Sequence, residues 1–306
     1  MRANNMDMDV DNQIKAFGKF QKHYRCDITF PIMDLDEYVN LVSNIHNKKE
    51  DIQKSKDFAK FSPEEILKIP QTSVIENSIT YQVLEGIQKQ FKEPTRYIGG
   101  YIPAPYTLVS LVLELQVASE LMIFEPDYIE SLIQFSTEIV EQYAALIKDF
   151  VDTFFILAPS ECTIMKKTYI DRVQESMNRL IKYCVSDLKM PSIVHFCSKK
   201  TGQVVNEDII KAMKGAGIEG LNIPTIIQNV DLAKKYDLVL CGGIDPISIQ
   251  LHPFEKFRQQ LLEILESTHE NRYIFGTNCQ VKWAPGQINA KELLNLFDKI
   301  KILRNK

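Results

Sequence analysis

Short apolar segments alternate with longer amphipathic segments along most of the chain. The apolar segments that indicate buried strands are 26–36, 97–105, 151–159, 191–197, 218–224, 237–246 and 271–279. Apolar residues recur at helical spacing between them, which predicts helices over 75–91, 107–120, 126–150, 166–188, 207–214, 227–235, 254–269 and 289–303. Strands that alternate with helices of roughly 8–20 residues indicate βαβ units and therefore a parallel sheet.

This rhythm favours one α/β fold, a (β/α)₈ TIM barrel with a short N-terminal appendage. An open doubly wound sheet would carry a glycine-rich phosphate loop after its first strand, and residues 26–36 contain no glycine. We expect the eighth strand in residues 71–77 or near the N-terminus. Residues 1–24 are polar and are expected to form an arm or a helix, followed by a single barrel domain over 25–306.

Composition excludes several classes of protein. A formal net charge of −4 and a pI near 5.8 argue against a nucleic-acid partner, because such binders present a basic face. No apolar run reaches about 18 residues, so we expect no membrane association, and the polar start MRANNMDMDV predicts no secretory signal. Six cysteines are too few for a secreted disulfide scaffold. We therefore expect a cytoplasmic protein with reduced thiols, large enough to bury a core without a structural metal.

The most informative residues stand where strands end. His195 and Cys197 close the strand at 191–197, and residues two apart on a strand share a face. Cys279 ends a later strand, and strand ends converge on one mouth of a parallel barrel. Three His and Cys ligands are typical of a catalytic zinc site with an open fourth position, and thiolates favour zinc over magnesium or calcium. The alternative is that these are packing side chains that happen to lie near strand ends.

Other strand ends carry further candidates. Glu161 and Asp245 are placed to move a proton or to support a metal-bound histidine, or else to cap a helix. Gly242 and Gly243 would let a ligand approach the backbone closely, or would simply make a tight exit from the strand. Tyr101 could line the mouth of the barrel and contact a cofactor, although single aromatic residues are more often core.

The remaining cysteines favour a plainer interpretation. Cys184 lies in the apolar stripe of a predicted helix and Cys241 lies within a predicted strand, so both are expected in the core. Cys26 and Cys162 could belong to either the core or a site.

From Tyr97 onward the order of motifs resembles the uroporphyrinogen decarboxylase superfamily. GGYIPAPYTLVSLVLEL, residues 99–115, resembles its Gly-x-x-x-x-Pro-Phe-Thr-Leu-Ala segment, and LVLCGGIDPISI, residues 238–249, resembles its Gly-Asn-Val-Asp-Pro segment. The His-x-Cys…Cys set is similar to that of the methyltransferase branch, the methylcobamide:coenzyme M methyltransferases.

The resemblance implies a TIM barrel that holds zinc on His195, Cys197 and Cys279. It implies that a small thiol such as coenzyme M takes the open position as a thiolate and accepts a methyl group from a methylated corrinoid (methylcobamide). The corrinoid would arrive on a separate carrier protein, which makes that protein a partner of the barrel mouth. Asp245 would lie near this mouth.

Three alternatives remain. A metal-free decarboxylase of the same fold is disfavoured, because decarboxylases proper lack the triad and eight arginines are few for gripping a polycarboxylate porphyrinogen. A homocysteine methyltransferase of the zinc methionine synthase kind would add a glutamate ligand on an intervening strand, where this chain has Pro224. A module that binds a corrinoid protein without turnover would bind its partner tightly and leave the methyl group in place.

Overall fold

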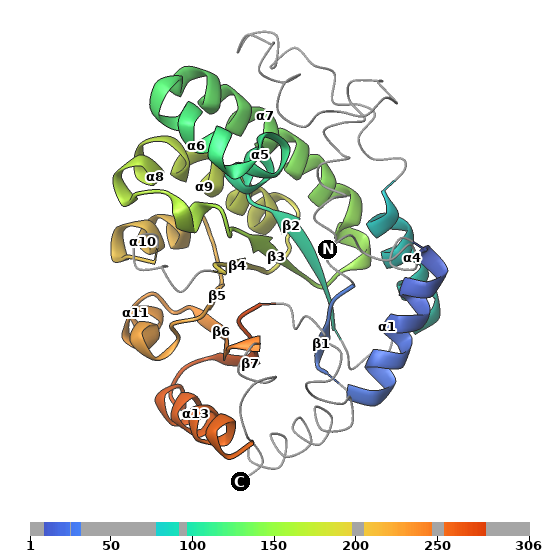
Figure 1. Cartoon of the computed structure of the whole chain (residues 1–306). Helices are drawn as coiled ribbons and strands as arrows, with labels where there is room; N and C mark the ends of the chain where they lie inside the picture. The colour runs from blue at the N-terminus through green and yellow to red at the C-terminus, as the bar shows by residue number, and fades with distance from the viewer. Residues whose placement is uncertain are drawn as a thin grey trace.

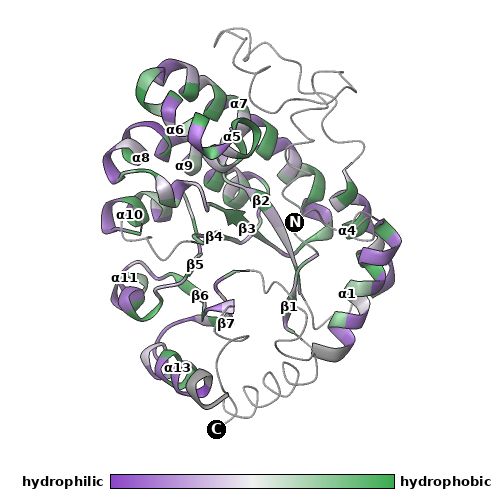
Figure 2. Cartoon of the chain, viewed as in Figure 1, coloured by the Kyte–Doolittle hydropathy of each residue, from purple (hydrophilic) through white to green (hydrophobic). Residues whose placement is uncertain are grey.

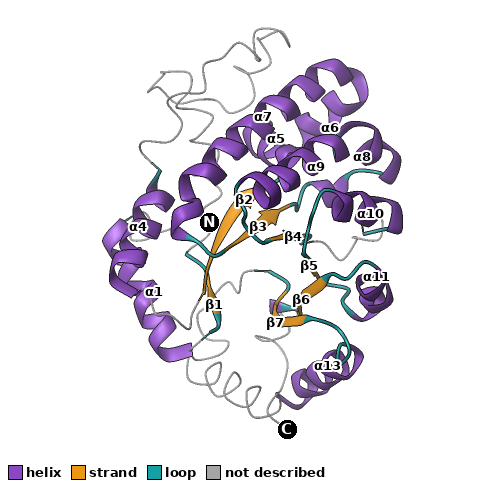
Figure 3. Ribbon diagram, turned by 180° about the vertical axis from the view of Figure 1, so that it is seen from behind, coloured by secondary structure: helices purple, strands orange, loops and turns teal. Residues whose placement is uncertain are grey.

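The computed structural model describes residues 9–24, 26–31, 78–91, 97–197, 205–246 and 254–279. These residues form one parallel sheet in which strands pair in the order of the chain. The sheet curls, and helices cover its convex side (Figures 1 and 3). Its strands are β1 (Ile28–Thr29), β2 (Tyr97–Pro103), β3 (Thr153–Leu157), β4 (Ser192–His195), β5 (Gly220–Ile223), β6 (Val239–Ile244) and β7 (Tyr273–Thr277).

The helices follow the strands in alternation, as βαβ units require. They are α1 (Val10–Tyr24), α4 (Ile79–Phe91), α5 (Pro105–Leu113), α6 (Leu115–Phe124), α7 (Pro126–Ile147), α8 (Lys166–Arg172), α9 (Gln174–Lys182), α10 (Glu207–Gly215), α11 (Val230–Lys235) and α13 (Phe254–Ser267). Short 3₁₀ turns are η3 (Lys148–Phe150), η4 (Glu161–Thr163) and η7 (Ile227–Asn229), and η5 (Tyr183–Asp187) is a π-helical turn.

Each of the seven predicted strands contains an observed strand, so the parallel α/β class is confirmed. Within the described part the sheet has seven strands, with β1 and β7 at its edges. The expected eighth strand of a closed (β/α)₈ barrel is therefore not confirmed. Residues 71–77, where it was expected, and the predicted helix over 289–303 both lie outside the described residues.

Each of two predicted helices corresponds to more than one observed element. The one expected over 107–120 is divided at Glu114, whose φ of 70° and ψ of 142° are not helical, and α5 and α6 meet there at 110°. The one expected over 166–188 consists of α8, α9 and the π turn η5, with a change at Val173. The prediction of a single helix over 107–120 was wrong, because apolar residues continue across the break and periodicity alone does not register a change in backbone direction. The helical path over 166–188 continues through Val173, whose N–H donates to Tyr169 and whose carbonyl accepts from Met177, and it ends in the π turn.

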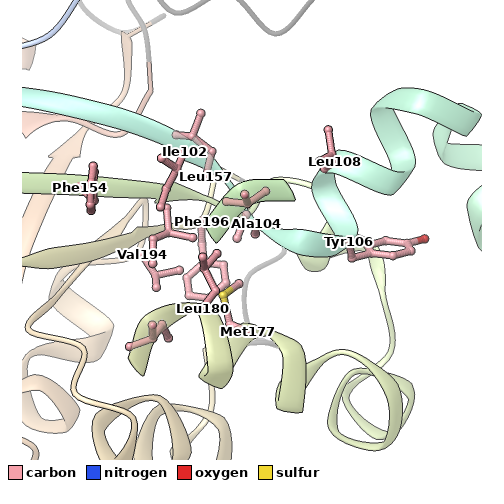
Figure 4. Close-up of a cluster of buried hydrophobic side chains, with 14 of the residues drawn as sticks. Ile102, Ala104, Tyr106, Leu108, Phe154, Leu157, Met177, Leu180, Val194 and Phe196 are labelled. Atoms are coloured by element: carbon pink, nitrogen blue, oxygen red, sulfur yellow. The ribbon is translucent and has the colours of Figure 1, made fainter. Parts of the chain in front are cut away.

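The two faces of the sheet are lined differently, because side chains alternate along a strand. Phe154, Val194 and Phe196 point to the helices and join the main core with Met177 and Leu180 (Figure 4). The helices that cover this face carry hydrophobic and hydrophilic sides (Figure 2). A separate, smaller cluster occupies the concave face, and it consists of Phe155, Ile193 and Cys241 with Phe30, Tyr101 and Ile274 against them.

The N-terminal segment is helical in its described part. Helix α1 buries Ile14 and Phe17 in the main core and packs against α4. Gly18 and Gly86 make this close approach possible, because a Cβ atom on either would overlap Phe91 or Ile14. Of the two alternatives, an arm or a helix, the described part is a helix over Val10–Tyr24, and the division into an N-terminal appendage and a barrel domain stays a prediction. Among the described helices none alone is long and apolar enough to cross a membrane, and only α5 and α6 taken together, as a bent pair, have that length and composition.

Candidate metal centre

His195, Cys197 and Cys279 meet at the carboxyl ends of two strands. His195 is the last residue of β4, Cys197 follows two residues later, and Cys279 follows two residues after β7. Their potential ligand atoms all lie within 4.8 Å of one another, and the two Sγ atoms are 3.3 Å apart. In a tetrahedral zinc site with Zn–S bonds of ~2.3 Å, two thiolates stand about 3.8 Å apart. The structure brings the three predicted residues together, and the donor types fit a zinc ion, which would hold the two sulfur atoms about 0.5 Å further apart.

Strand alternation explains why these side chains reach the concave face. Val194 and Phe196 are fully buried on the opposite face of β4, against the helices. Ile193, His195 and Cys197 therefore share the inner side. His195 is 9% exposed, and Cys197 and Cys279 are half-buried. The centre is thus enclosed at the histidine and accessible at the thiols.

Asn222 supports the histidine. It lies on β5 in register with His195 on one side and with Cys241 on the other. Its Oδ1 is 2.5 Å from Nδ1 of His195, and its Nδ2 donates to Sγ of Cys241 at 3.3 Å and to the carbonyl of Thr277 at 3.4 Å. Sequence reasoning missed Asn222, although a polar residue at an inner position of the buried segment 218–224 was the available signal.

Gly242 and Gly243 form a kink in β6, with φ values of 99° and 93°. A Cβ atom on Gly242 would lie 2.8 Å from Nδ2 of Asn222 and 3.2 Å from Oδ1 of Asn278. The same Oδ1 accepts the backbone N–H of Gly243 at 2.5 Å. The protein's own amides thus occupy the space beside Gly242, and contact of either glycine with a cofactor stays a prediction.

Tyr101 lies beside the candidate centre. It projects from β2 onto the concave face, where its ring stacks on Phe30 with centroids 4.6 Å apart. Burial raises the pKa of its hydroxyl, and the nearby thiols of Cys279 and Cys241 raise it further. Tyr101 is therefore a neutral wall of the space in front of the thiols, and its contact with a cofactor stays a prediction.

Glu161 lies beneath the amino end of α5. Its side chain is fully buried; Oε1 accepts the N–H of Thr107 at 3.1 Å, and Oε2 accepts the Thr107 hydroxyl. Burial raises its pKa to about 7, while the hydrogen bonds from Thr107 oppose that shift. Among the described residues, no hydrogen bond joins Glu161 to His195, Cys197 or Cys279. The geometry is that of a helix cap, and a catalytic role for Glu161 stays a prediction.

The other sequence candidates have simpler positions. Asp245 follows β6 and is half-buried, and its role stays a prediction. Cys184 is fully buried in the main core, as expected. Cys241 is also buried, but on the concave face, where its sulfur accepts from Asn222. Cys162 is buried in the main core with its thiol toward the carbonyl of Ala158.

Comparison with known proteins places the chain among relatives of this fold. The sequence profile of the family described as uroporphyrinogen decarboxylase (URO-D) matches residues 43–300. No curated protein matches the chain significantly in sequence.

Two solved structures are similar. A methyltransferase from Methanosarcina mazei shares 16% identity with a TM-score of 0.75, over 97% of this chain and 87% of that one. A B12-independent methionine synthase from a Shewanella species, in complex with selenomethionine, shares 15% identity with a TM-score of 0.52, over 74% of this chain and 66% of that one. At these identities the similarity is one of fold. Because the family profile spans most of the sequence, this chain belongs to the uroporphyrinogen decarboxylase family.

Proposed function

We propose that this chain is a zinc-dependent methyltransferase that moves a methyl group from a methylated corrinoid to a small thiol such as coenzyme M. The observation that carries the proposal is the meeting of one imidazole and two thiols within 4.8 Å at the carboxyl edge of the sheet. The presence of a methyltransferase and a methionine synthase among proteins of similar fold supports it. The methylated corrinoid would be presented by a carrier protein, as in the branch that the motif resembles.

Each of the residues at this site would have a separate role. His195, Cys197 and Cys279 would hold the metal and leave one position of a tetrahedron open. A zinc ion held there lowers the pKa of an incoming thiol, so that the thiol reacts as a thiolate at neutral pH. With zinc bound, such a thiolate would be able to accept a methyl group from a methylated corrinoid, whose cobalt would keep the electron pair of the carbon–cobalt bond. Phe30 and Tyr101 give this space an apolar wall that limits water.

Decarboxylation of a polycarboxylate fits the described residues less well. Gripping several carboxylates requires arginines directed into the site. Arg172, Arg179 and Arg272 instead pair with acidic residues at the surface of the molecule. The concave face between the described strands carries an apolar cluster beside the imidazole of His195 and the amide of Asn222. This lining favours a small thiol over a porphyrinogen.

The first test is the zinc content of the purified protein. We expect about one zinc per chain in the wild type and in Cys184→Ala, whose thiol is buried in the core away from the triad. Cys197→Ala and Cys279→Ala should each lose the metal while remaining folded. Absence of zinc from the reconstituted wild type would contradict the proposal.

The second test is methyl transfer from free methylcobalamin, followed by the change in corrinoid absorbance. Coenzyme M and homocysteine are compared as acceptors at equal concentration, because both are small thiols. Zinc-loaded wild type should demethylate the corrinoid, and Cys279→Ala should be slower by at least about 100-fold, since the metal supplies the thiolate. Tight binding of the corrinoid without loss of its methyl group would support a binding module instead.

A further inference from the structure

We infer that Asn222 is a positioning residue that fixes the tautomer of His195 and presents its Nε2 atom to the metal. The inference rests on the proposed zinc site and adds a residue that the sequence motif does not contain. It also explains why the residue at this position is a neutral amide, since a neutral amide adds no negative charge beside an anionic thiolate substrate.

The orientation of the Asn222 amide is set by its surroundings. The side chain is 3% exposed, so its polar atoms must find partners within the protein. Its Nδ2 atom faces two acceptors, Sγ of Cys241 at 3.3 Å and the carbonyl oxygen of Thr277 at 3.4 Å. An amide turned the other way would place its oxygen against a carbonyl oxygen and would leave a donor toward His195. The oxygen of Asn222 therefore faces the histidine.

An acceptor at this place determines where the histidine proton resides. Oδ1 of Asn222 lies 2.5 Å from Nδ1 of His195, so Nδ1 carries the hydrogen and donates it. Nε2 is then the unprotonated nitrogen with a lone pair available to a metal ion. In metal-binding histidines the N–H of the nitrogen that does not bind the metal commonly donates a hydrogen bond in this way. The acceptor fixes both the tautomer and the ring orientation.

The kink at Gly242 makes room for this amide. A Cβ atom on Gly242 would approach Nδ2 of Asn222 to 2.8 Å, closer than real Cβ contacts allow. Asn278, the residue before Cys279, reaches back to the N–H of Gly243 at 2.5 Å. Asn222 itself joins the two strand ends, because it contacts His195 at the end of β4 and the carbonyl of Thr277 at the end of β7.

The neutrality of Asn222 has a chemical consequence. Zinc with two thiolates and a neutral imidazole carries no net charge, and a substrate thiolate would add one negative charge. A carboxylate at position 222 would add a second negative charge in a buried place, where charges interact strongly. The amide holds the histidine equally well in geometry and leaves the centre receptive to an anionic thiolate.

The test compares Asn222→Leu, which removes the acceptor at similar size, with Asn222→Asp, which keeps the acceptor toward His195, adds charge and replaces the amide donor that faces Cys241 and Thr277. Ser192→Ala is the matched control, because it removes a buried side-chain hydrogen bond at the other end of β4. Zinc affinity is measured by competition with a chromophoric chelator, and thiol affinity of the zinc-loaded proteins by calorimetry with coenzyme M. The tautomer of His195 is measured on metal-free protein by ¹⁵N NMR, with His195→Gln to assign the signal.

Wild type should show the Nδ1–H tautomer, and Asn222→Leu should lose it and bind zinc roughly 10- to 100-fold more weakly. Asn222→Asp should keep the tautomer and the zinc but bind the thiol at least about 10-fold more weakly, and Ser192→Ala should match wild type. An Nε2–H tautomer in wild type, or unchanged zinc affinity in Asn222→Leu, would overturn the inference. Because the NMR measurement needs no metal, a wild type that binds no zinc would refute the proposed function without deciding this test. If Asn222→Leu does not fold, the wild-type tautomer and the Asp variant still decide it.

Discussion

Two pairs of cysteines on this chain have very different surroundings. Cys197 and Cys279 are half-buried with their Sγ atoms 3.3 Å apart. Cys184 and Cys241 are buried, and burial raises the pKa of their thiols to about 12 and about 11. The thiolate is the reactive form of cysteine, so the two buried thiols should be inert. Cys26 is also half-buried, so accessibility alone does not single out one pair, but the short Sγ–Sγ distance allows Cys197 and Cys279 to form a disulfide with each other.

We expect hydrogen peroxide to join Cys197 and Cys279 in a disulfide when the metal has been removed. The two thiols give up two electrons and two protons, and the peroxide is reduced to two molecules of water. Peptide mass mapping should find a loss of 2 hydrogen atoms confined to this pair, and dithiothreitol should restore both thiols. Zinc-loaded protein is the control and should react at least about 10-fold more slowly. Oxidation spread over several cysteines would show that the two thiols are not paired as described.

The convergence of the candidate triad could be predicted from the sequence because its members have local signals. The i, i+2 spacing of His195 and Cys197 defines one face of a strand, and strand ends gather on one side of a parallel sheet. Asn222 and Asn278 were not predicted, since their roles depend on the register between strands that are far apart in sequence. Local spacing carries no information about that register.

At the scale of elements, Glu161 connects η4 to the first turn of α5. The carboxyl is fully buried and is bonded to the N–H and the hydroxyl of Thr107. A charge on this carboxyl raises the pKa of the nearby hydroxyls of Tyr106 and Tyr169. Burial raises the pKa of Glu161 to about 7 from an ordinary value of 4.5. The folded protein therefore binds one more proton than the unfolded chain between these two pH values.

This difference predicts how stability changes with pH. Because the folded state holds the extra proton, the Glu161 contribution is fully present below pH 4.5 and is lost as pH rises through about 7. At about 1.4 kcal/mol per pH unit, the loss is roughly 3 kcal/mol. Glu161→Gln resembles the protonated acid and should lack this loss, so its stability relative to wild type should increase from pH 5 to pH 8 in urea unfolding. Glu120→Gln, at an exposed position of α6, is the control. If the difference in unfolding free energy between Glu161→Gln and wild type stays constant over this range, folding does not raise the pKa of Glu161.

Helix positions were largely predictable, whereas helix breaks were not. Hydrophobic periodicity placed α4, α7 and α10 close to their observed bounds. It missed the turn at Glu114, because that residue is neither glycine nor proline and nothing in its type announces a φ of 70°. Burial differs across the turn: α5 is enclosed on nearly all sides, while α6 leaves Leu115, Ile123 and Phe124 exposed.

At the scale of the molecule, the alternation of strands and helices was sufficient to predict a parallel, curled sheet. All seven predicted strands contain an observed strand, and they pair in chain order. Closure of this sheet into an eight-stranded barrel would require contacts between segments near the two ends of the chain. Such contacts form over the longest sequence separation, where local patterns say least.

The whole molecule also determines what the metal can contribute to stability. The main core extends from α1 to α13 and is formed by apolar side chains between the sheet and the helices. The candidate ligands lie at one rim of the sheet and cross-link only the ends of β4 and β7. A core of this extent does not depend on that link, unlike the core of a small zinc domain.

We therefore expect removal of zinc by a chelator to leave the chain folded. The near- and far-ultraviolet circular dichroism should be unchanged, and calorimetry should show one cooperative transition, lowered by a few °C. The shift follows from binding linkage, which is about 2.7 kcal/mol for free zinc at 100 times its dissociation constant. Cys279→Ala should unfold at the temperature of the metal-free wild type whether or not zinc is added, since it lacks a ligand. A metal-free wild type without near-ultraviolet dichroism would instead show that the centre holds the fold together.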